Sequence, residues 1–486
     1  MPAGVRIVPL SDVGERAPID VAESFRDLPG LAVLDSARPG RNGRWSYVSA
    51  DPVDIVESPS DGPDPFEAAR ISLKRMAAGR VGRAGPPFLG GLVGYLSYDL
   101  GRRFERLPSI ARADQTLPLL RLALHDWVVA WDRRIGQAWL AGRAVDGNAR
   151  RLGRRLDEVR ARLDDRRLSR APTSDRLPER FASIEDGLAD PLVFRSGLDR
   201  AAFERGVGTI RDAIARGQIY QANLSRRLEA PFDGDPWPLF RQLRTGDPAL
   251  FAAYLDLGEY RALLSASPEP YLALDPSGRT MADPIKGTRP RGRTPEEDRV
   301  LARELLASAK DRAENVMIVD VLRNDLGRVS EPGSVRVPRF LRLERTAAVQ
   351  HLVTTVTGQL LPGRGPFDLL SAAFPGGSIT GAPKIRAMQI LERLEPVRRG
   401  PYTGALGWIG PDGAMATSIL IRTFVADGAR LTLHVGGGIT WGSDPSAEWD
   451  ETVTKARGPL GAIGGREVPD AARPTRDREV PSATAR

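Results

Sequence analysis

The sequence predicts an α+β fold whose strands pair mainly antiparallel, and three patterns support this class. Strand-like segments fill residues 20–145, where "DWVVAW" and "QAWLAG" flank "DRRIG" as in a β-hairpin. Residues 401–438 contain two Asp-Gly dipeptides, at Asp412 and Asp427, each between β-rich segments, so they predict a three-stranded antiparallel meander. Amphipathic helical patterns, the first over residues 149–170, lie between these strand-rich parts.

The first region, residues 1–170, is predicted to end in a linker helix. Its strand-like segments include "RWSYVS" and "FLGGLVGYLSYDL". Over residues 149–170, one helical stripe carries four apolar residues and charged residues fill the other positions. The stripe consists of Leu152, Leu156, Val159 and Leu163. The loop-like text "APTSDRLPER" follows, so we place a boundary between two regions here.

Residues 171–457 form the second predicted region, and residues 458–486 a flexible tail rich in Pro, Gly and Arg. Near its start, "DRAAFERGVGTIRDAIARGQIYQANLSRRL" indicates a helix that Gly217 ends, and then a strand. Thr294 and Glu297 form a capping box around a proline at the first helical position, so a long helical region begins there. With 486 residues, the chain can form two structural units or one large intertwined unit.

The composition narrows the chemistry that the chain can perform. It has no cysteine, which excludes disulfides, thiolate metal sites and the cysteine nucleophile of a glutamine-hydrolysing triad. Its three histidines, His125, His351 and His434, are too few for a multi-histidine metal site. The net charge of +8 comes with interleaved acids and no recognition motif, so we expect an anionic small substrate and no nucleic acid. No run of eighteen apolar residues and no signal-like start occurs, so we expect a cytoplasmic protein without membrane contact.

Two helical segments carry paired carboxylates. Asp311 and Glu314 are three residues apart in "AKDRAENVMIVDVLRND", and Glu448, Glu451 and Lys455 share a face of "SDPSAEWDETVTKA". Such pairs are commonly solvated helix faces. If the two helices oppose each other across a cleft, the pairs would instead form an oxygen site for Mg²⁺.

Two glycine-rich segments could bind anions. "FPGGSITGAPKIRAMQIL", residues 374–391, is a turn that leads into a helix, whose free amides suit an anion, although a purely structural turn is the alternative. Gly436 to Gly438 end the third strand of the meander, with Tyr402 and Arg422 on neighbouring strands. Counting from the second turn places Arg422 opposite Leu433, so this group could bind a carboxylate through amides and an arginine.

A single lysine lies in "MADPIKGTRPRGRTPEED", residues 281–298, just before the capping box. From the residues alone, Lys286 has three possible roles: an exposed surface charge, an anion clamp or a nucleophile. Most lysines are exposed, which favours the first role for an arbitrary lysine.

Several segments, in this order, resemble those of the chorismate-utilising enzymes. They are "YQANLSRR", "SASPEPYL", "PIKGTRPRG", "KDRAENVMIVDVLRNDLGRV", "VQHLVTTVTG", "FPGGSITGAPK", "YTGALGW" and "GGGITWGSDPSAEWDETVTKA". "GRWSYVSADP" and "FLGGLVGYLSYDL" extend the resemblance to the amino-terminal region of anthranilate and aminodeoxychorismate synthases. The resemblance implies two mainly antiparallel sheets packed as a sandwich with flanking helices, and an active site in the cleft between them.

The resemblance also implies roles for the candidate residues. Glu314 and Glu451 would bind Mg²⁺ directly, with Asp311 and Glu448 close by or acting through water. The residues that would hold the pyruvyl carboxylate of chorismate are Tyr402, Arg422, Lys455 and the amides of Gly436, Gly437 and Gly438. His351 aligns with the histidine that assists departure of the ring hydroxyl, and Glu269 resembles the proton-transfer carboxylate. Gly287, Thr288 and Ser378 are expected to lie against the substrate.

Two positions indicate the branch of the family. Isochorismate and salicylate synthases, which add water, carry a lysine base where this chain has Gln221, so water activation is not expected here. Anthranilate synthases usually read "PIAGT" and aminodeoxychorismate synthases "PIKGT", and this chain has Lys286. The resemblance therefore implies an aminodeoxychorismate synthase component I, which feeds 4-aminobenzoate and folate biosynthesis.

In this branch Lys286 would be the nucleophile. It would add to the ring as the hydroxyl leaves, and ammonia would then add and expel it. This requires a neutral amine, so we expect burial near Mg²⁺ to lower the pKa of Lys286. Since the chain has no cysteine, ammonia would come from a separate glutaminase subunit.

Two alternatives remain open: an anthranilate synthase component I, and a catalytically inert binding subunit. "VLDSA", residues 33–37, replaces the Leu-Leu-Glu-Ser element of tryptophan-regulated relatives and disfavours feedback control by tryptophan.

Overall fold

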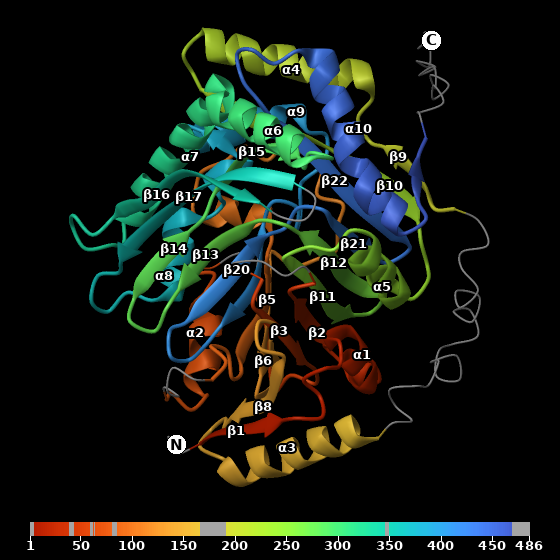
Figure 1. Cartoon of the computed structure of the whole chain (residues 1–486), viewed down its shortest axis with the longest axis vertical. Coiled ribbons are helices and arrows are strands. Elements are labelled where there is room, and N and C mark those ends of the chain that lie inside the picture. Colours follow the sequence, from red (N-terminus) through yellow and green to blue (C-terminus); the bar gives the residue numbers. More distant parts are fainter. Residues whose placement is uncertain are drawn as a thin grey trace, which may run out of the picture.

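The computed structural model describes residues 4–37, 43–58, 62, 64–79, 85–165, 191–345 and 349–468. Two large, mainly antiparallel sheets form the body of the molecule, and helices lie around them (Figure 1). This confirms the predicted α+β class.

The first sheet has thirteen strands. In spatial order, twelve of them are β1 (Val5–Leu10), β8 (Gln137–Arg143), β7 (Trp127–Asp132), β3 (Trp45–Ser49), β2 (Ala32–Asp35), β11 (Phe251–Gly258), β12 (Arg261–Ser267), β21 (Thr423–Asp427), β22 (Arg430–Ile439), β10 (Gln221–Pro231), β9 (Val193–Ser196) and β23 (Arg466–Glu467). The short strand β18 (Gly381–Ala382) also pairs with β10. Of the pairs in this sheet, β23 with β9 is parallel and the others are antiparallel.

The second sheet has ten strands, all paired antiparallel. Nine of them, in spatial order, are β15 (Ile285–Pro290), β17 (Val349–Gln359), β14 (Arg279–Ala282), β13 (Pro270–Leu274), β20 (Met415–Ile419), β19 (Ala405–Ile409), β5 (Gly91–Leu96), β6 (Leu120–His125) and β4 (Asp54–Glu57). The tenth, β16 (Arg336–Arg345), pairs with β17.

The helices begin where short polar side chains or prolines can start them. They are α1 (Pro18–Ala22), α2 (Glu67–Lys74), α3 (Ala149–Asp164), α4 (Arg200–Ala215), α5 (Pro236–Gly246), α6 (Pro295–Ala307), α7 (Ala309–Gly327), α8 (Pro366–Ala373), α9 (Lys384–Leu394) and α10 (Pro445–Ala462). Asn148, Asp199, Ser308 and Asp444 each accept a backbone N–H from the first turn of α3, α4, α7 and α10. The predicted cap of α6 is present, since the Thr294 hydroxyl accepts the Glu297 N–H at 3.2 Å.

Strands from both predicted regions share each sheet, so the described chain forms one intertwined body. β2 pairs with β11 in the first sheet, and β5 pairs with β19 in the second.

The predicted hairpin is also present as β7 and β8. All six residues of β7 are buried, including Trp127 and Trp131. Burying each large apolar side chain contributes roughly 1.5–3 kcal/mol. Trp127 and Trp131 share one apolar cluster with Phe240 and Leu264, so this strand helps join both regions in one core.

The predicted three-stranded meander is wrong in its middle strand. The chain between the two Asp-Gly turns forms two strands, β20 in the second sheet and β21 in the first, instead of one. Arg422 lies at the crossing between them with a φ of 50°, in the left-handed region. The register prediction is therefore also wrong, because Leu433 faces Phe424 and Arg422 lies outside β21.

The flexible tail was predicted to begin at residue 458, but the structure describes the chain as far as residue 468. Helix α10 continues past residue 458 to Ala462, and β23 then pairs with β9. Leu460 and Ile463 are buried in the large apolar cluster, which explains why this stretch is held despite its glycines. The rest of the predicted tail, from residue 469, lies outside the described residues.

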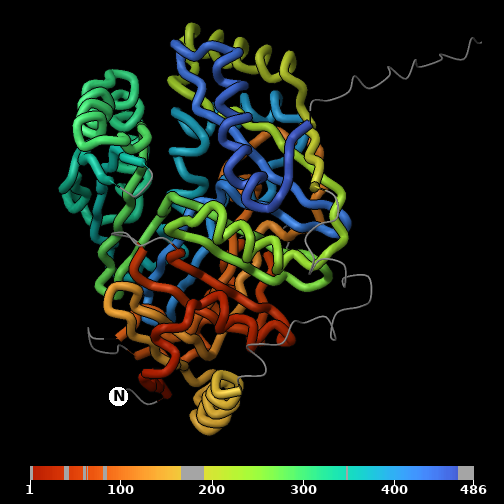
Figure 2. The backbone as a smooth tube through the Cα atoms, turned by 45° about the vertical axis from the view of Figure 1, so that its right-hand side comes forward, coloured from red at the N-terminus to blue at the C-terminus, as the bar shows by residue number. Residues whose placement is uncertain are grey.

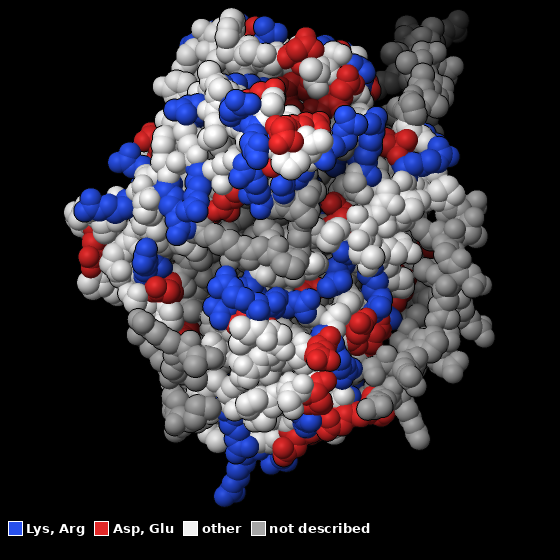
Figure 3. Space-filling model, in the orientation of Figure 1, with Lys and Arg blue, Asp and Glu red and all other residues white. Residues whose placement is uncertain are grey.

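Charged side chains of both signs are interspersed over the face in Figure 3.

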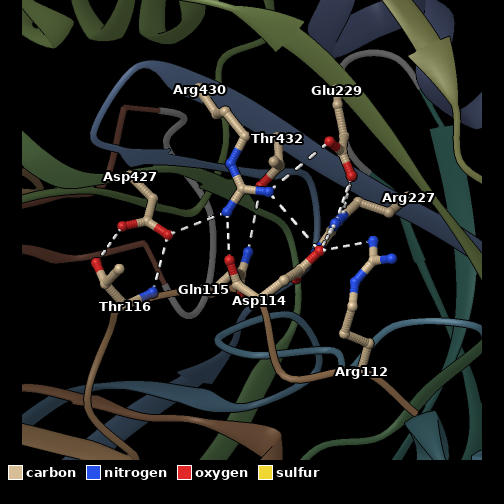
Figure 4. A network of polar contacts seen from close by, with 9 residues as sticks. All are labelled: Arg112, Asp114, Gln115, Thr116, Arg227, Glu229, Asp427, Arg430 and Thr432. Carbon is tan, nitrogen blue, oxygen red and sulfur yellow. Dashed lines mark hydrogen bonds and ion pairs between the residues drawn. The ribbon is translucent and has the colours of Figure 1, made fainter.

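One ion-pair network anchors the segment before β6 to the ends of β10 and β22 (Figure 4). There the Asp114 carboxylate accepts from Arg227 at 2.7 and 2.6 Å, and Arg112 and Arg430 lie nearby. Burial disfavours the charge of Asp114, but these arginines outweigh that effect and lower its pKa to about 2.

This network predicts an acid-sensitive contribution to stability. Since the pKa of Asp114 is lower in the folded than in the unfolded chain, its contribution is complete above about pH 4 and is lost as the pH falls toward 2. We expect Asp114→Asn to lower the free energy of unfolding by about 2 kcal/mol at pH 7, and the difference from the native protein to shrink between pH 4 and 2. Urea unfolding followed by tryptophan fluorescence at several pH values measures this. Asp157→Asn, at an exposed position of α3, is the control, and a difference that stays constant down to pH 2 would contradict the assignment.

Candidate functional site

The predicted metal-binding carboxylates lie on α7 and α10, two helices at the same end of the molecule (Figure 1). Figure 2 shows α6 and α7, in green, on one side and α10, in blue, on the other. β15 of the second sheet carries Lys286, Gly287 and Thr288, β17 carries His351, and β22 of the first sheet carries Gly436 to Gly438.

Lys286 lies on β15 and points toward α7. Its Nζ is 2.9 Å from Oε1 of Glu314 and donates to the carbonyl of Ser378 at 3.2 Å. Its side chain is 16% exposed, so its environment is not that of an ordinary surface lysine. The strand bulges at the next residue, Gly287, which has a φ of 75° and lies so close to α7 that an added Cβ would be 3.0 Å from Asp311.

Glu314 connects Lys286 to strand β10. The Nε2 atom of Gln221 donates to its Oε1 at 3.1 Å. Burial opposes ionisation of Glu314, but the Lys286 charge and these hydrogen bonds outweigh it and lower its pKa. Gln221 is 1% exposed, and its Oε1 has no hydrogen-bond partner within the described residues.

Glu269 approaches the same lysine from the link between β12 and β13. Its carboxyl is hydrogen-bonded to the Ser378 side chain, in the 3₁₀ turn Gly377–Ile379. Desolvation raises the pKa of Glu269, and the nearby Lys286 charge only partly opposes this. A carboxyl with a raised pKa beside an amine can hold and return a proton near neutral pH.

Gly437 and Gly438 form a floor between the carboxylates. A Cβ at Gly438 would be 2.2 Å from Nε2 of Gln221 and 3.3 Å from Oε1 of Glu314, and one at Gly437 would be 3.2 Å from Oε2 of Glu448. Only glycine leaves this space open. As predicted, the strand ends with these glycines: Gly436 to Gly438 lie just before the last residue of β22, Ile439, and pair with β10 along one edge. Beyond Leu433, however, β21 no longer covers the other edge of β22.

Helix α10 supplies the opposite wall. Nζ of Lys455 is 2.7 Å from Oε1 of Glu451 and donates to the Gly436 carbonyl at 2.9 Å. Glu448 is buried, and burial, together with the Glu451 charge, raises its pKa against a hydrogen bond from Ser443. The helical spacing that grouped these three charged residues in the sequence therefore does place them on one face.

A divalent cation fits the chemistry of this wall. Glu314, Glu448 and Glu451 offer only oxygen donors, all bordering Gly437 and Gly438, and a cation would relieve the crowding of like charges around Glu448. Glu314 and Glu451 each pair one oxygen with a lysine, and within the described ranges no group of three or more His, Cys, Asp or Glu side chains is arranged so that it could hold a metal ion. Asp311 lies one turn before Glu314, but its contact is with Arg289 at 3.2 Å.

Four predicted residues lie apart from this cluster. Nδ1 of His351 and the exposed Thr288 hydroxyl are 3.0 Å apart, across β15 and β17. Arg422 is 46% exposed and faces Asp247 at 3.4 Å. Tyr402 is buried, and its ring stacks on His434 with centroids 4.9 Å apart.

An open cavity of about 1190 Å³ reaches the cluster from outside. Gln221 and Glu314 are among the residues that line it. The exposed aromatic side chains of Tyr220, Phe340 and Trp441 line it as well. The cavity therefore connects the Glu314 side of the cluster with solvent.

A second cavity, of about 570 Å³, lies between the sheets. Asp35 and Ser36, from the "VLDSA" segment, line it. The Asp35 carboxylate is already paired, with Arg244 at 2.6 Å and with the Ser46 hydroxyl at 2.8 Å. That feedback control by tryptophan is disfavoured in this chain stays a sequence-based prediction.

Sequence reasoning missed a buried polar layer behind the cluster. It consists of Asn223, Glu395, Arg399 and His434. Arginine and glutamate are rarely buried, so no local pattern marks Arg399 or Glu395 as interior residues.

The described chain contains no helix that is both long and apolar enough to cross a membrane.

Comparison with known proteins identifies what this arrangement resembles. The pattern of the chorismate binding enzyme family matches residues 35–461. The chain is 41% identical over 448 residues to anthranilate synthase component 1 of Streptomyces coelicolor, covering 91% of this chain and 85% of that protein. It is 42% identical over 369 residues to aminodeoxychorismate synthase component 1 of Klebsiella aerogenes, covering 76% of each. Among solved structures, anthranilate synthase component I from Streptococcus pneumoniae matches with a TM-score of 0.75 and 29% identity, over 87% of this chain and 93% of that one.

Proposed function

Because the chain belongs to the chorismate binding enzyme family and acts on chorismate, we propose that it aminates this substrate to 4-amino-4-deoxychorismate, as an aminodeoxychorismate synthase component I. One observation carries the proposal: the Lys286 amine lies beside Glu314 and Ser378, and Glu314, together with its partner Gln221, lines the open cavity. In the sequence, "PIKGT" is typical of the aminating branch, whereas anthranilate synthases usually have alanine in place of this lysine.

The amine can act in two balanced displacements. In the first, a C–N bond forms between the ring and neutral Nζ, the ring C–O bond breaks, and the hydroxyl leaves as water after taking up a proton. In the second, ammonia forms its own C–N bond, the C–Nζ bond breaks, and the lysine amine is regenerated. Glu269 is placed to take the proton that Nζ gives up and to return it, because its carboxyl shares the Ser378 turn with Lys286.

Glu314, Glu448 and Glu451 would hold Mg²⁺, with Asp311 close by. When bound, this ion would supply positive charge to a substrate carboxylate. Lys455 and the amides along Gly436 to Gly438 border the same space, so they could hold a second anionic group of chorismate.

In this proposal, ammonia has to reach the ring carbon that is bonded to Lys286. Since the sequence has no cysteine for glutamine hydrolysis, we propose a glutaminase subunit as the source, in line with the "component 1" in the names of the relatives. The buried Oε1 of Gln221, without a partner in the described chain, could accept a hydrogen bond from ammonia.

The second candidate is an anthranilate synthase component I. It is favoured by the S. coelicolor relative, which matches 91% of this chain, against 76% for the K. aerogenes relative. That reaction would proceed to loss of pyruvate and an aromatic product.

A product assay decides between these functions. We expect purified protein with chorismate, Mg²⁺ and an ammonium salt to form aminodeoxychorismate, which an added lyase converts to 4-aminobenzoate. Chromatography with mass detection measures both products, and a reaction without ammonium is the control. Anthranilate and pyruvate as main products would overturn the proposal in favour of the second candidate, and unconsumed chorismate would favour an inert binding subunit.

A further inference from the structure

Arg399 is one of the largest side chains that the fold buries completely, at 2% exposure. Its guanidinium forms a two-pronged pair with Glu395, with Nε to Oε2 and Nη2 to Oε1 both at 2.8 Å. Glu395 also accepts the backbone N–H and the hydroxyl of Ser225, on β10. A buried pair of this kind contributes little net stability by itself, because removing both charges from water is costly. What it does provide is a set of donors held in fixed directions.

Those donors hold the turn that touches Lys286. Nη1 of Arg399 donates to the carbonyl of Ile379 at 3.0 Å, at the end of the 3₁₀ turn Gly377–Ile379. The side-chain amide of Asn223 donates to the same carbonyl at 3.2 Å, and Nη2 of Arg399 donates to the Asn223 carbonyl. Two buried donors therefore fix one carbonyl, one residue away from Ser378.

Ser378 in turn contacts two groups of the candidate site. Its carbonyl accepts from Nζ of Lys286, and its side chain is bonded to the Glu269 carboxyl. Arg399 itself is too deeply buried to touch a substrate. Its effect on the site has to pass through the turn.

Arg399 also supports the corner that carries Tyr402. Its guanidinium carbon is 4.6 Å from the ring centre of Tyr98 and 5.7 Å from that of Tyr402, and Nη1 donates to the Thr403 hydroxyl at 3.2 Å. The guanidinium therefore connects the segment of Tyr98 with the corner of Tyr402 and Thr403.

We propose that Arg399 is a positioning residue: through Ile379 it fixes the Ser378 turn and thereby the direction of the Lys286 amine. Its consequence for catalysis depends on the proposed function, but its consequence for the lysine does not. Removing the guanidinium should free the Ile379 carbonyl, loosen the Ser378 turn and change how Lys286 is held, without removing any group that touches substrate.

The test measures the reactivity of Lys286 in the absence of substrate. Native protein and Arg399→Met are treated briefly with acetic anhydride, and the labelling rate of each lysine is read by peptide mass spectrometry. We expect the rate at Lys286 to change by at least roughly threefold, because a displaced amine has a different access and nucleophilicity, while the rates at Lys74 and Lys310 stay constant. The matched control is Arg227→Met, which removes another buried arginine paired to carboxylates on β10 but far from the turn, and should leave Lys286 unchanged.

Two further variants keep the test decisive. Arg399→Lys retains the charge beside Glu395 but not the two-pronged guanidinium, and Asn223→Ala removes only the second donor to Ile379. Both should change the labelling rate at Lys286 less than Arg399→Met does. They provide the test if Arg399→Met fails to fold. In the aminating assay we expect Arg399→Met to lower kcat by about tenfold or more, with a smaller rise in KM, and Arg399→Lys to restore part of this loss. An unchanged Lys286 rate in folded Arg399 variants, or an equal change at all lysines, would overturn the proposal.

Discussion

Lys286→Ala is expected to lower the rate of aminodeoxychorismate formation by at least about two orders of magnitude while leaving Mg²⁺ binding intact. The reason is that alanine removes the one amine that lies against both Glu314 and the Ser378 carbonyl, so the first displacement loses its nucleophile. Product formation with an ammonium salt measures the rate, and calorimetric Mg²⁺ titration measures the binding.

A second variant separates a nucleophile from an anion clamp. Lys286→Arg keeps a positive charge near Glu314 but supplies no neutral amine at neutral pH, since the guanidinium stays protonated. If Lys286 is the nucleophile, arginine should be as inactive as alanine. If it only attracts the substrate, arginine should retain much of the rate.

The covalent intermediate gives an independent readout. Without ammonium, the native protein should accumulate a chorismate-derived adduct at Lys286, which peptide mass spectrometry can locate. Lys74→Ala, on the exposed face of α2, is the control for general effects of removing a lysine. A full reaction rate for Lys286→Ala, or an adduct on a different residue, would show that the lysine is a bystander.

Local patterns in the sequence were enough to predict much of the fold. The hairpin of β7 and β8 and the cap of α6 follow from turn chemistry and side-chain period, which act over a few residues. The change of sheet at Arg422 did not follow, because a left-handed arginine is held by its surroundings and carries no marker such as glycine or asparagine. The meander was therefore counted as continuous, and the register came out wrong.

The candidate site was predictable only in part, for the same reason. Helical spacing placed Glu448, Glu451 and Lys455 on one face of α10, and the structure agrees. That this face meets Gly437 and Gly438 depends on how α10 packs on β22, which no local pattern determines. The layer around Arg399 was missed altogether, because its partners come from distant segments, such as that of Asn223, 176 residues away.

Lys286 and the proposed Mg²⁺ would compete for the Glu314 carboxylate. In the structure its Oε1 faces both Nζ of Lys286 and Nε2 of Gln221. The same carboxylate is the proposed ligand for Mg²⁺, and an oxygen engaged by a cation is less available to Nζ. Occupation of the metal site would thus release the Lys286 amine from this ion pair. Glu314 would then serve both ligand binding and positioning of the lysine.

Glu314→Gln is therefore expected to weaken Mg²⁺ binding by at least about tenfold and to lower the rate even at saturating Mg²⁺. Glutamine keeps the size of the side chain and can still bond to Gln221, but it carries no charge for the cation or for Lys286. Calorimetric titration measures the affinity, and the dependence of the amination rate on Mg²⁺ concentration measures the activity. Glu304→Gln, at an exposed position of α6, should behave like the native protein. Unchanged Mg²⁺ affinity in Glu314→Gln would remove Glu314 from the metal site, and full recovery of the rate at high Mg²⁺ would limit its role to holding the ion.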